Sequence, residues 1–244
     1  MLKVSDLSVR YGDAAAVTGA SFDVEEQEIA AIVGTNGAGK SSLARAVGGL
    51  TPASGTVRLG ERDLSGLNAE GRVKAGVVYV PEGRRVFPQL TVEDNLRAGG
   101  FTRRRSHDWR RRMSELYERV PRLKERAQVR AGLLSGGEQQ LLAICRALMA
   151  RPSVLLMDEP SLGLAPRAID AVADLLVDLR TAERLAVVIF EQNAAFTSRL
   201  ANRAWVLRLG EIQTVLSKEQ VADPECIRDT LMDGTSAGKE PERP

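Results

Sequence analysis

A glycine-rich segment, Gly-Thr-Asn-Gly-Ala-Gly-Lys-Ser at residues 34–41, constrains the fold of this chain more than any other feature. The apolar run 29–33 before it predicts a buried strand, and residues 42–47 after it predict the first turns of a helix. Glycines let backbone N–H groups approach a phosphate closely, and a helix N-terminus adds partial positive charge. A strand, this loop and a helix in succession therefore predict a P-loop, which binds a nucleoside triphosphate.

The lysine and serine that end this loop are expected to contact different parts of the nucleotide. Lys40 would reach the β- and γ-phosphates, and Ser41 would hold Mg²⁺. The expected nucleotide contacts of the loop are Gly34, Asn36, Gly37, Ala38, Gly39, Lys40, Ser41 and Ser42. The alternative is a plain glycine-rich turn between a strand and a helix, which the flanking pattern makes the weaker interpretation.

Composition excludes several classes of protein. The chain has 244 residues, enough for one large domain or two small ones, and its formal net charge of +2 is too small to argue for nucleic acid. The two cysteines, Cys145 and Cys226, lack metal-ligand spacing and are expected to be free thiols in a reducing compartment. No stretch resembles a signal peptide or is long enough to span a membrane. We therefore expect a cytoplasmic protein that reaches a membrane only through partners.

Strands and helices are expected to alternate along the chain, except in its middle. Expected strands cover residues 2–11, 16–24, 29–33, 54–61, 76–80, 154–157, 186–190 and 205–216, the last as a hairpin. Helical spacing dominates residues 91–150, and further helices are expected at 168–180, 217–222 and 224–232. The pattern favours an α/β P-loop NTPase with a mostly parallel core sheet, an antiparallel edge sheet and an inserted helical subdomain.

We expect one domain over residues 1–232, with its core at 1–90 and 151–232 and the helical subdomain at 91–150. The remaining residues, 233–244, are rich in glycine, proline and charge and are expected to be disordered.

Two arginine clusters, Arg103–Arg105 and Arg110–Arg112, fall in the helical middle. They are expected to form a solvated helical face or loop, because no aromatic stacking platform for nucleic acid accompanies them. His107, the single histidine, lies in the same region and is expected at the surface rather than in catalysis.

A pair of acids, Asp158 and Glu159, directly follows the apolar strand 154–157. Beside a P-loop, Asp158 would help to bind Mg²⁺ through water, and Glu159 would polarise the water that attacks the γ-phosphate. An acidic turn at the end of a strand is the alternative, and it would be preferred if the pair stood alone.

A third motif, Leu-Ser-Gly-Gly-Glu-Gln-Gln at residues 134–140, opens a helix and could form a second anion-binding N-terminus or an ordinary capped helix. The P-loop, this motif and the apolar run ending in Asp-Glu-Pro at 158–160, in this order and spacing, resemble the ATP-binding subunits of ABC transporters. The resemblance covers residues 1 to about 232.

The resemblance implies how the nucleotide is bound. Tyr11 stands where the family has an aromatic residue that stacks on adenine. Two ATPase subunits would pair head to tail, with each ATP between one P-loop and the signature motif of the partner. Ser135 and Gly137, with Gly136 between them, would thus contact ATP held by the other subunit.

Three positions depart from the general pattern of that family. Glu82 replaces the usual glutamine after the strand 77–80, and we place it in the Mg²⁺ site with Ser41 and Asp158. Gln192 replaces the switch histidine; it can hydrogen-bond the γ-phosphate or water, but it cannot carry charge. Slower hydrolysis, or dependence on the site of a partner, is therefore expected, with Glu159 and Gln192 as the catalytic residues. Ala165 stands where aspartate is common.

Four segments together resemble the LivF type, one of two ATPase subunits of the high-affinity branched-chain amino acid importers. They are residues 80–96, 134–152, 158–166 and 191–193. The related urea and short-chain amide importers are the closest alternative. The LivG-type sister subunit usually carries a longer loop insertion and a Glu-His pair near the switch, and neither is evident here.

This resemblance also implies partners and a location. The chain would pair with a LivG-type sister subunit, or with itself when isolated. It would bind two membrane permease subunits through a groove at residues 82–96, and would serve a periplasmic solute-binding protein indirectly. Its place would be the cytoplasmic face of the inner membrane.

Two other classes of function are weaker. A soluble ABC ATPase acting on nucleic acid or ribosomes usually has tandem domains or a long coiled-coil insertion, and neither is present. Gln192 and Ala165 suggest a catalytically weak regulatory subunit, but the intact acids Asp158 and Glu159 beside the P-loop argue against it.

Overall fold

The computed structural model describes residues 1–101 and 108–233. Arg103–Arg105, His107 and the tail beyond Asp233 lie outside the described residues, so the expectations for them stay predictions.

Five apolar runs form parallel strands because the sheet buries them on both faces. They are β3 (Ile29–Val33), β6 (Val77–Val80), β7 (Val154–Asp158), β8 (Ala186–Glu191) and β9 (Arg203–Arg208). The strand order is β10-β9-β3-β8-β7-β6, and β10 (Glu211–Leu216) pairs antiparallel with β9 as the predicted hairpin. Parallel strands end at a common edge, so the residues that follow β3, β7 and β8 are brought together there.

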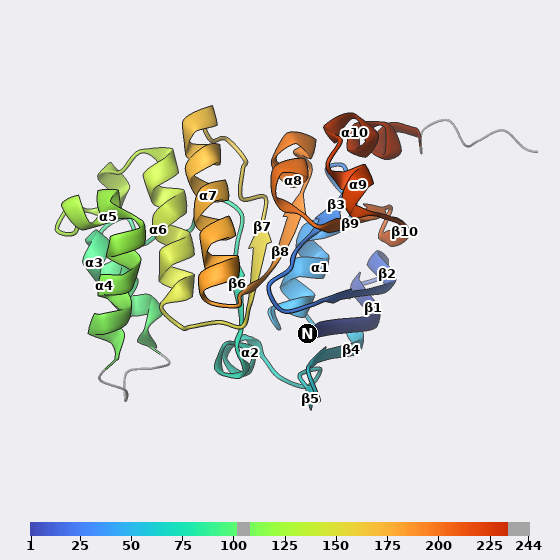
Figure 1. Cartoon of the computed structure of the whole chain (residues 1–244). Coiled ribbons are helices and arrows are strands. Elements are labelled where there is room, and N and C mark those ends of the chain that lie inside the picture. Colours follow the sequence, from blue (N-terminus) through green and yellow to red (C-terminus); the bar gives the residue numbers. More distant parts are fainter. Residues whose placement is uncertain (102–107, 234–244) are drawn as a thin grey trace, which may run out of the picture.

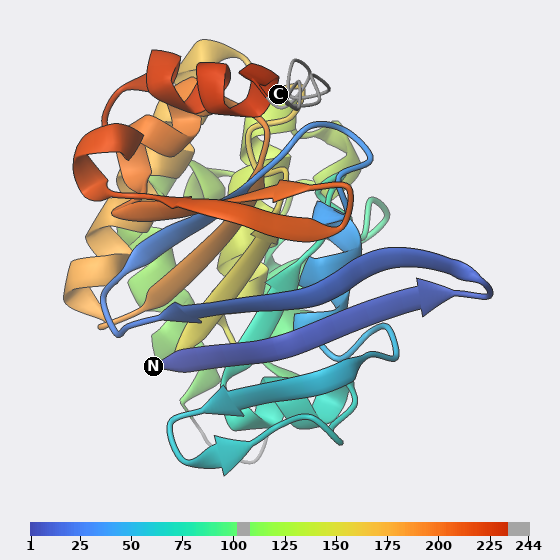
Figure 2. The ribbon, with the colours of Figure 1, turned by 90° about the vertical axis from the view of Figure 1, so that its right-hand side faces the viewer.

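The early strands form the separate antiparallel sheet that the sequence predicted. Its order is β2-β1-β4-β5, and Figure 2 shows it beside the parallel sheet. Its strands are β1 (Leu2–Tyr11), β2 (Ala14–Val24), β4 (Ser54–Leu59) and β5 (Arg62–Asp63). Helix α1 (Lys40–Val47) lies between the two sheets, where Leu43 and Val47 share one apolar core with both.

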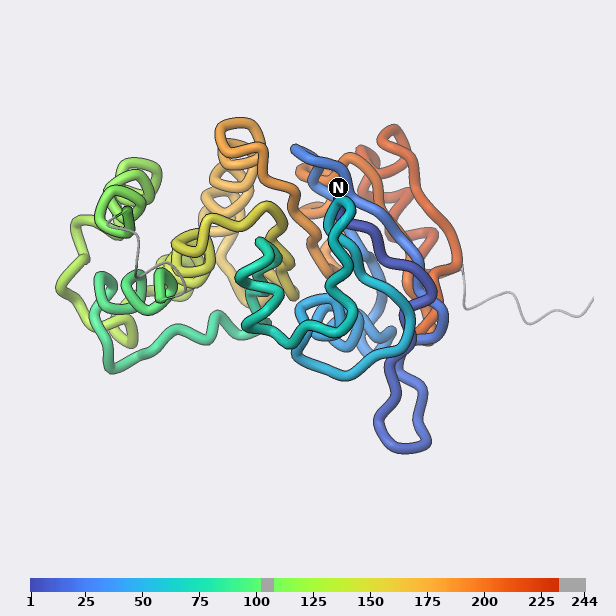
Figure 3. Tube along the Cα trace, turned by 90° about the horizontal axis from the view of Figure 1, so that it is seen from below, coloured from blue at the N-terminus to red at the C-terminus, as the bar shows by residue number. Residues whose placement is uncertain are grey.

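Helices cover the other face of the parallel sheet (Figure 1). These are α6 (Gly136–Leu148), α7 (Pro166–Ala182) and α8 (Ala194–Leu200), which pack on a second apolar core. The predicted helical middle consists of α3 (Val92–Gly99), α4 (Trp109–Arg119), α5 (Pro121–Glu125), the short helix η2 (Ala131–Leu133) and α6. Figure 3 shows α3–α5 at one end of the molecule and the antiparallel sheet at the other. Helices α9 (Lys218–Val221) and α10 (Pro224–Asp233) close the described chain.

Helix α2 (Ala69–Ala75) was not predicted. It has a single buried residue, Arg72, and so shows no apolar period. Instead, its ends define it: the Asn68 side chain caps the first turn, and Gly76 ends the helix in a left-handed conformation.

The expected solvated face at residues 110–112 is wrong for Arg112. Its guanidinium is buried and donates to both carboxylate oxygens of Glu183, at 2.6 and 2.7 Å. Its Nε donates to the Leu148 carbonyl at 3.0 Å. Because the charge is fully paired, it can lie between α4 and the end of α7, whereas Arg110 and Arg111 are exposed.

This pairing gives a testable prediction for stability. Arg112→Ala should lower the free energy of unfolding by about 3 kcal/mol, because Glu183 would keep a largely buried charge with only the longer contact to Arg119, at 3.6 Å. Urea unfolding measures the loss, and Arg111→Ala, at an exposed neighbour, is the matched control. Equal losses in the two variants would show that the pair does not hold α4 to α7.

Candidate functional site

The P-loop lies between β3 and α1, as predicted, and two of its glycines are required by close backbone approaches. A Cβ on Gly39, whose φ is +106°, would lie 2.5 Å from the Ala16 carbonyl oxygen. A Cβ on Gly34 would lie 2.5 Å from the Leu207 carbonyl oxygen. The loop therefore fits between the two sheets only with glycine at both positions.

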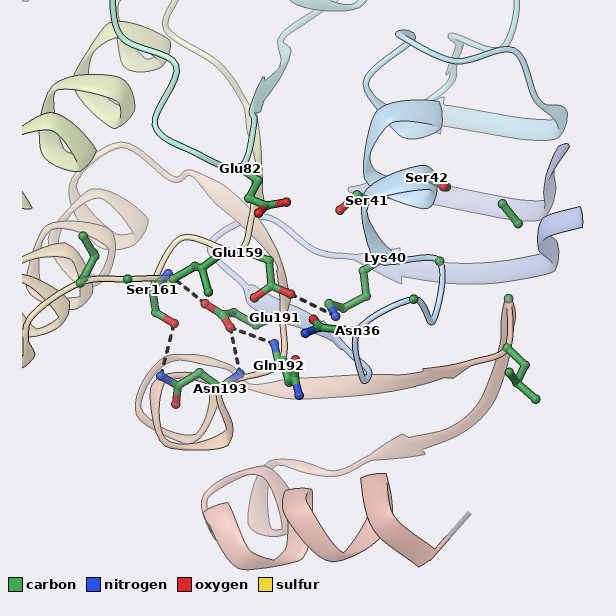
Figure 4. Close-up of a pocket in the computed structure, with 18 of the residues that line it drawn as sticks. Asn36, Lys40, Ser41, Ser42, Glu82, Glu159, Ser161, Glu191, Gln192 and Asn193 are labelled. Atoms are coloured by element: carbon green, nitrogen blue, oxygen red, sulfur yellow. Dashed lines mark hydrogen bonds and ion pairs between the residues drawn. The ribbon is translucent and has the colours of Figure 1, made fainter. Parts of the chain in front are cut away.

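Lys40 is buried within this loop. Its Nζ donates to the carbonyl oxygens of Gly34 and Thr35, at 2.8 and 3.1 Å, and forms an ion pair with Glu159 Oε1 at 3.0 Å. Figure 4 shows the Lys40 and Glu159 side chains directed toward each other across the cleft. The Lys40 ammonium group is thus held between the backbone of the P-loop and the Glu159 carboxylate.

Ser41 and Asp158, 117 residues apart in the chain, are joined by a hydrogen bond. The Ser41 hydroxyl donates to Asp158 Oδ1 at 3.0 Å, and the Tyr79 hydroxyl donates to Asp158 Oδ2 at 2.8 Å. Burial raises the pKa of Asp158, although these two hydrogen bonds lower it. Burial, together with the Asp158 charge, also raises the pKa of Tyr79, so its phenol keeps its proton.

The Ser41 hydroxyl and the Asp158 carboxylate offer oxygen ligands, which a hard cation such as Mg²⁺ prefers. Within the described ranges, no three His, Cys, Asp or Glu side chains gather in a cluster that could hold a metal alone. Mg²⁺ that accompanies a nucleotide takes only one or two protein ligands, with phosphates and water for the rest. Ser41 and Asp158 therefore fit such an ion, and Glu82 lines the same cleft.

Glu159 has a perturbed acidity. Burial and the nearby Glu191 carboxylate raise its pKa to about 7, and the Lys40 cation acts in the opposite direction. Its backbone has a φ of +46°, an uncommon conformation for a residue with a side chain. A carboxylate with a pKa near neutrality is suited to accept a proton from water.

This raised pKa predicts a pH dependence of stability. Between about pH 4.5 and 7 the folded chain holds a proton on Glu159 that the unfolded chain has lost, so this residue makes the fold less stable as pH rises. Glu159→Gln should abolish that contribution. Urea unfolding of both proteins, without nucleotide, measures this effect at pH 5 and pH 7.5. The free energy of unfolding of the variant, relative to that of the wild type, should be larger at pH 7.5 than at pH 5. An equal difference at both pH values would contradict the assignment.

Glu191 links two loops of the site, and the sequence analysis did not identify it. It is buried, its Oε1 accepts from the Ser161 amide at 2.9 Å, and its Oε2 accepts from the Gln192 and Asn193 amides, each at 2.9 Å. Figure 4 shows these bonds converging on one carboxylate. The loop after Glu159 and the switch residue Gln192 are thus fixed to each other.

An open cleft of about 970 Å³ joins these groups. It brings together predicted residues from three strand ends and the P-loop: Asn36, Gly37, Gly39, Lys40, Ser41, Ser42, Glu82, Glu159 and Gln192. The described lining does not include Gly34 and Ala38, which are buried within the loop, or Asp158, which is buried and hydrogen-bonded to Ser41.

The predicted adenine-stacking residue, Tyr11, lies at the end of β1. It is half-exposed, and a hydrogen bond with Ser42 lowers its pKa. It is not among the described residues that line the cleft. The accessible aromatic ring of Tyr11 therefore lies next to α1, beside Ser42.

The cleft is not lined by the signature residues of its own chain, among the residues that the structure describes; these are Ser135, Gly136 and Gly137. Ser135 caps α6, with Glu138 bonding back to its amide as a capping box. A Cβ on Gly137 would lie 2.5 Å from the Ala168 Cβ, so glycine lets α6 approach α7. The structure shows the helix cap, and the contact of these residues with ATP held by a partner stays a prediction.

The sequence analysis missed Tyr79, Arg45, Ser161, Glu191 and Asn193. Glu191 had a usable signal, since it ends a buried strand at the edge where the P-loop lies. Tyr79 had none, because a tyrosine within an apolar strand is typical of a core residue. A hydrogen bond with Tyr79 raises the pKa of Arg45, which lies one helical turn after Ser41.

A P-loop lysine and serine beside two strand-end acids define the class of P-loop nucleotide-hydrolysing enzymes. A protein-family model described as "ABC transporter" matches residues 17–162. The chain belongs to the ABC transporter family, as an ATP-binding subunit with ATPase activity.

Individual relatives agree with this family. The chain is 46% identical over 213 residues to the high-affinity branched-chain amino acid transport ATP-binding protein BraG of Pseudomonas aeruginosa, covering 87% of this chain and 91% of the relative. It is 32% identical to the probable branched-chain amino acid transport ATP-binding protein LivF of Archaeoglobus fulgidus, covering 87% and 90%. The ADP conformation of MJ1267, an ATP-binding cassette of an ABC transporter, shares the fold, with a TM-score of 0.83, 23% identity and coverage of 98% and 99%.

Across residues 1–101 and 108–233, no helix combines the length and the apolar character that a membrane crossing requires. Cys145 and Cys226 are free thiols, as predicted, and Cys145 is buried.

Proposed function

We propose that this chain is the LivF-type ATPase subunit of an importer of branched-chain amino acids. The observation that carries the cargo assignment is the similarity to BraG of Pseudomonas aeruginosa. The urea and short-chain amide importers are the second candidate, supported only by the resemblance of the sequence motifs.

In the proposed reaction, ATP binds in the cleft between the P-loop and the loop after β7. Lys40 exchanges its ion pair with Glu159 for the β- and γ-phosphates, which frees the carboxylate. Glu159 then orients the attacking water and accepts its proton, in keeping with its raised pKa. Gln192 lies across the cleft, where its amide can hydrogen-bond the γ-phosphate or that water.

Ser41 and Asp158 would hold Mg²⁺, with Glu82 beside them. When bound, Mg²⁺ neutralises charge that develops on the phosphates. Tyr11 would stack on the adenine, since its ring is accessible beside α1. These roles follow from the family resemblance and from the hydrogen bonds around Asp158.

We propose a head-to-tail pair of ATPase subunits, the second being a LivG-type sister chain or another copy. Ser135, Gly136 and Gly137 would contact ATP on the partner, which accounts for their distance from their own cleft. The half-exposed Phe87 and Leu90 lie in the segment 82–96 that would receive a helix of the permease. The assembly would act at the cytoplasmic face of the inner membrane, and a periplasmic binding protein would deliver the solute.

Uptake of labelled leucine and labelled urea tests this proposal. Cells that lack the chain should lose leucine uptake and keep urea uptake; the wild-type chain should restore leucine uptake, and Lys40→Ala should not. Loss of urea uptake alone would assign the chain to the second candidate. Unchanged uptake of both would refute the cargo assignment without touching the ATPase.

The neutral switch residue gives a separate prediction. Gln192→His should raise ATP turnover by about 10-fold, because histidine can carry charge and move protons where an amide cannot. Steady-state phosphate release measures the change, with Gln213→His on the exposed side of β10 as the control. Unchanged turnover would count against a limiting role for Gln192.

A further inference from the structure

The β6 residue Tyr79 reaches the metal side of the site because of the strand register. Tyr79 pairs with Leu156 on β7, and side chains alternate between the two faces of the sheet. Tyr79, Leu156 and Asp158 therefore share the face that α1 covers. The Tyr79 side chain also packs against the end of α1, since a Cβ on Gly48 would lie 3.2 Å from the Tyr79 Cβ.

Both oxygens of the Asp158 carboxylate are fixed by hydroxyl donors. Ser41 bonds to Oδ1 at 3.0 Å, and Tyr79 bonds to Oδ2 at 2.8 Å. Asp158 is only 2% exposed, so water has little access to replace a lost donor. Without Tyr79, no donor from residues 1–101 and 108–233 would remain on the buried Oδ2, and the carboxylate could rotate away from Ser41.

The direction of the phenol proton is also determined. An ionised carboxylate can only accept, so the Tyr79 hydroxyl directs its proton to Asp158 Oδ2. The nearby Tyr79 oxygen raises the pKa of Arg45, which keeps its charge on α1. Tyr79 thus packs against α1, belongs to β6 and donates to the carboxylate that ends β7.

We propose that Tyr79 is a positioning residue that orients Asp158 toward the divalent cation bound with the nucleotide. The inference rests on the proposed function, since it concerns the cation of that same site. Residues that hydrogen-bond a metal ligand typically change the metal affinity by about 10–100-fold when they are replaced.

The test uses Mn²⁺, which prefers the same oxygen ligands as Mg²⁺, with a non-hydrolysable ATP analogue on the purified full chain. Electron paramagnetic resonance measures the free Mn²⁺ during a titration. Tyr79→Phe should weaken Mn²⁺ binding by about 10-fold. Binding of the analogue in EDTA should stay as in the wild type, which also shows that the variant is folded. Tyr117→Phe is the matched control, because the buried Tyr117 hydroxyl has no hydrogen-bond partner among the residues that the structure describes.

Equal Mn²⁺ affinity in Tyr79→Phe and wild type would overturn the inference, whatever the effect on ATP turnover. A matching loss in Tyr117→Phe would also overturn it, since the effect would then be general to buried tyrosines. If the wild type bound the analogue without binding any Mn²⁺, both the proposed Mg²⁺-dependent function and the inference about Tyr79 would be wrong. These three results are separable within one set of titrations.

Discussion

Replacing Glu159 by glutamine is expected to lower steady-state ATP hydrolysis by about 10²–10⁴-fold, the usual contribution of a positioned acid–base group. Glutamine has nearly the same shape, so Lys40, Ser41 and the cleft should stay in place. It cannot accept the proton of the attacking water, and hydrolysis is therefore lost while ATP binding is kept. Phosphate release and binding of a fluorescent ATP analogue measure the two properties separately.

The same substitution should leave the fold intact or stabilise it, because it removes one of two neighbouring buried carboxylates, Glu159 and Glu191. An activity lost without a loss of stability would separate a catalytic role from a structural one. Glu211→Gln, at an exposed position of β10, serves as the control. A Glu159→Gln protein that hydrolyses ATP within about 3-fold of wild type would exclude Glu159 as the base, since even a weak acid–base contribution is larger.

Replacing Lys40 by alanine is expected to weaken ATP binding by about 10- to 100-fold, the range for a lost hydrogen bond to a charged group. Lys40 is the cation buried inside the P-loop, with its Nζ within 3.1 Å of two loop carbonyls and Glu159. Its removal also leaves Glu159 without the positive charge that lowers its pKa. Hydrolysis should therefore fall further than binding.

Isothermal titration with ATP measures this affinity, and Lys74→Ala provides the matched control. Lys74 forms an exposed ion pair with Glu70 on α2, so its loss should change neither binding nor hydrolysis. If Lys40→Ala bound ATP as tightly as Lys74→Ala, the phosphates would be bound by the loop backbone alone.

The local sequence determined the P-loop, the strand-end acids and the order of strands and helices. These features could be predicted because each depends on neighbours in the chain: a glycine-rich turn between an apolar strand and a helix, or acids directly after a buried run. The antiparallel edge sheet and the helical middle were predicted for the same reason, since each has its own periodicity. The family was then identified from the combination of motifs, because no single residue is specific enough to identify it.

Only the tertiary structure decided which distant groups meet. Ser41, Tyr79 and Asp158 come from α1, β6 and β7, and parallel pairing brings them together at one edge of the sheet. The sequence could not distinguish Arg112, buried on Glu183, from its exposed neighbours, because the three residues have identical chemistry. Burial and pairing between elements far apart in the chain set the pKa of Glu159 and the orientation of Asp158, and these are properties of packing, not of sequence order.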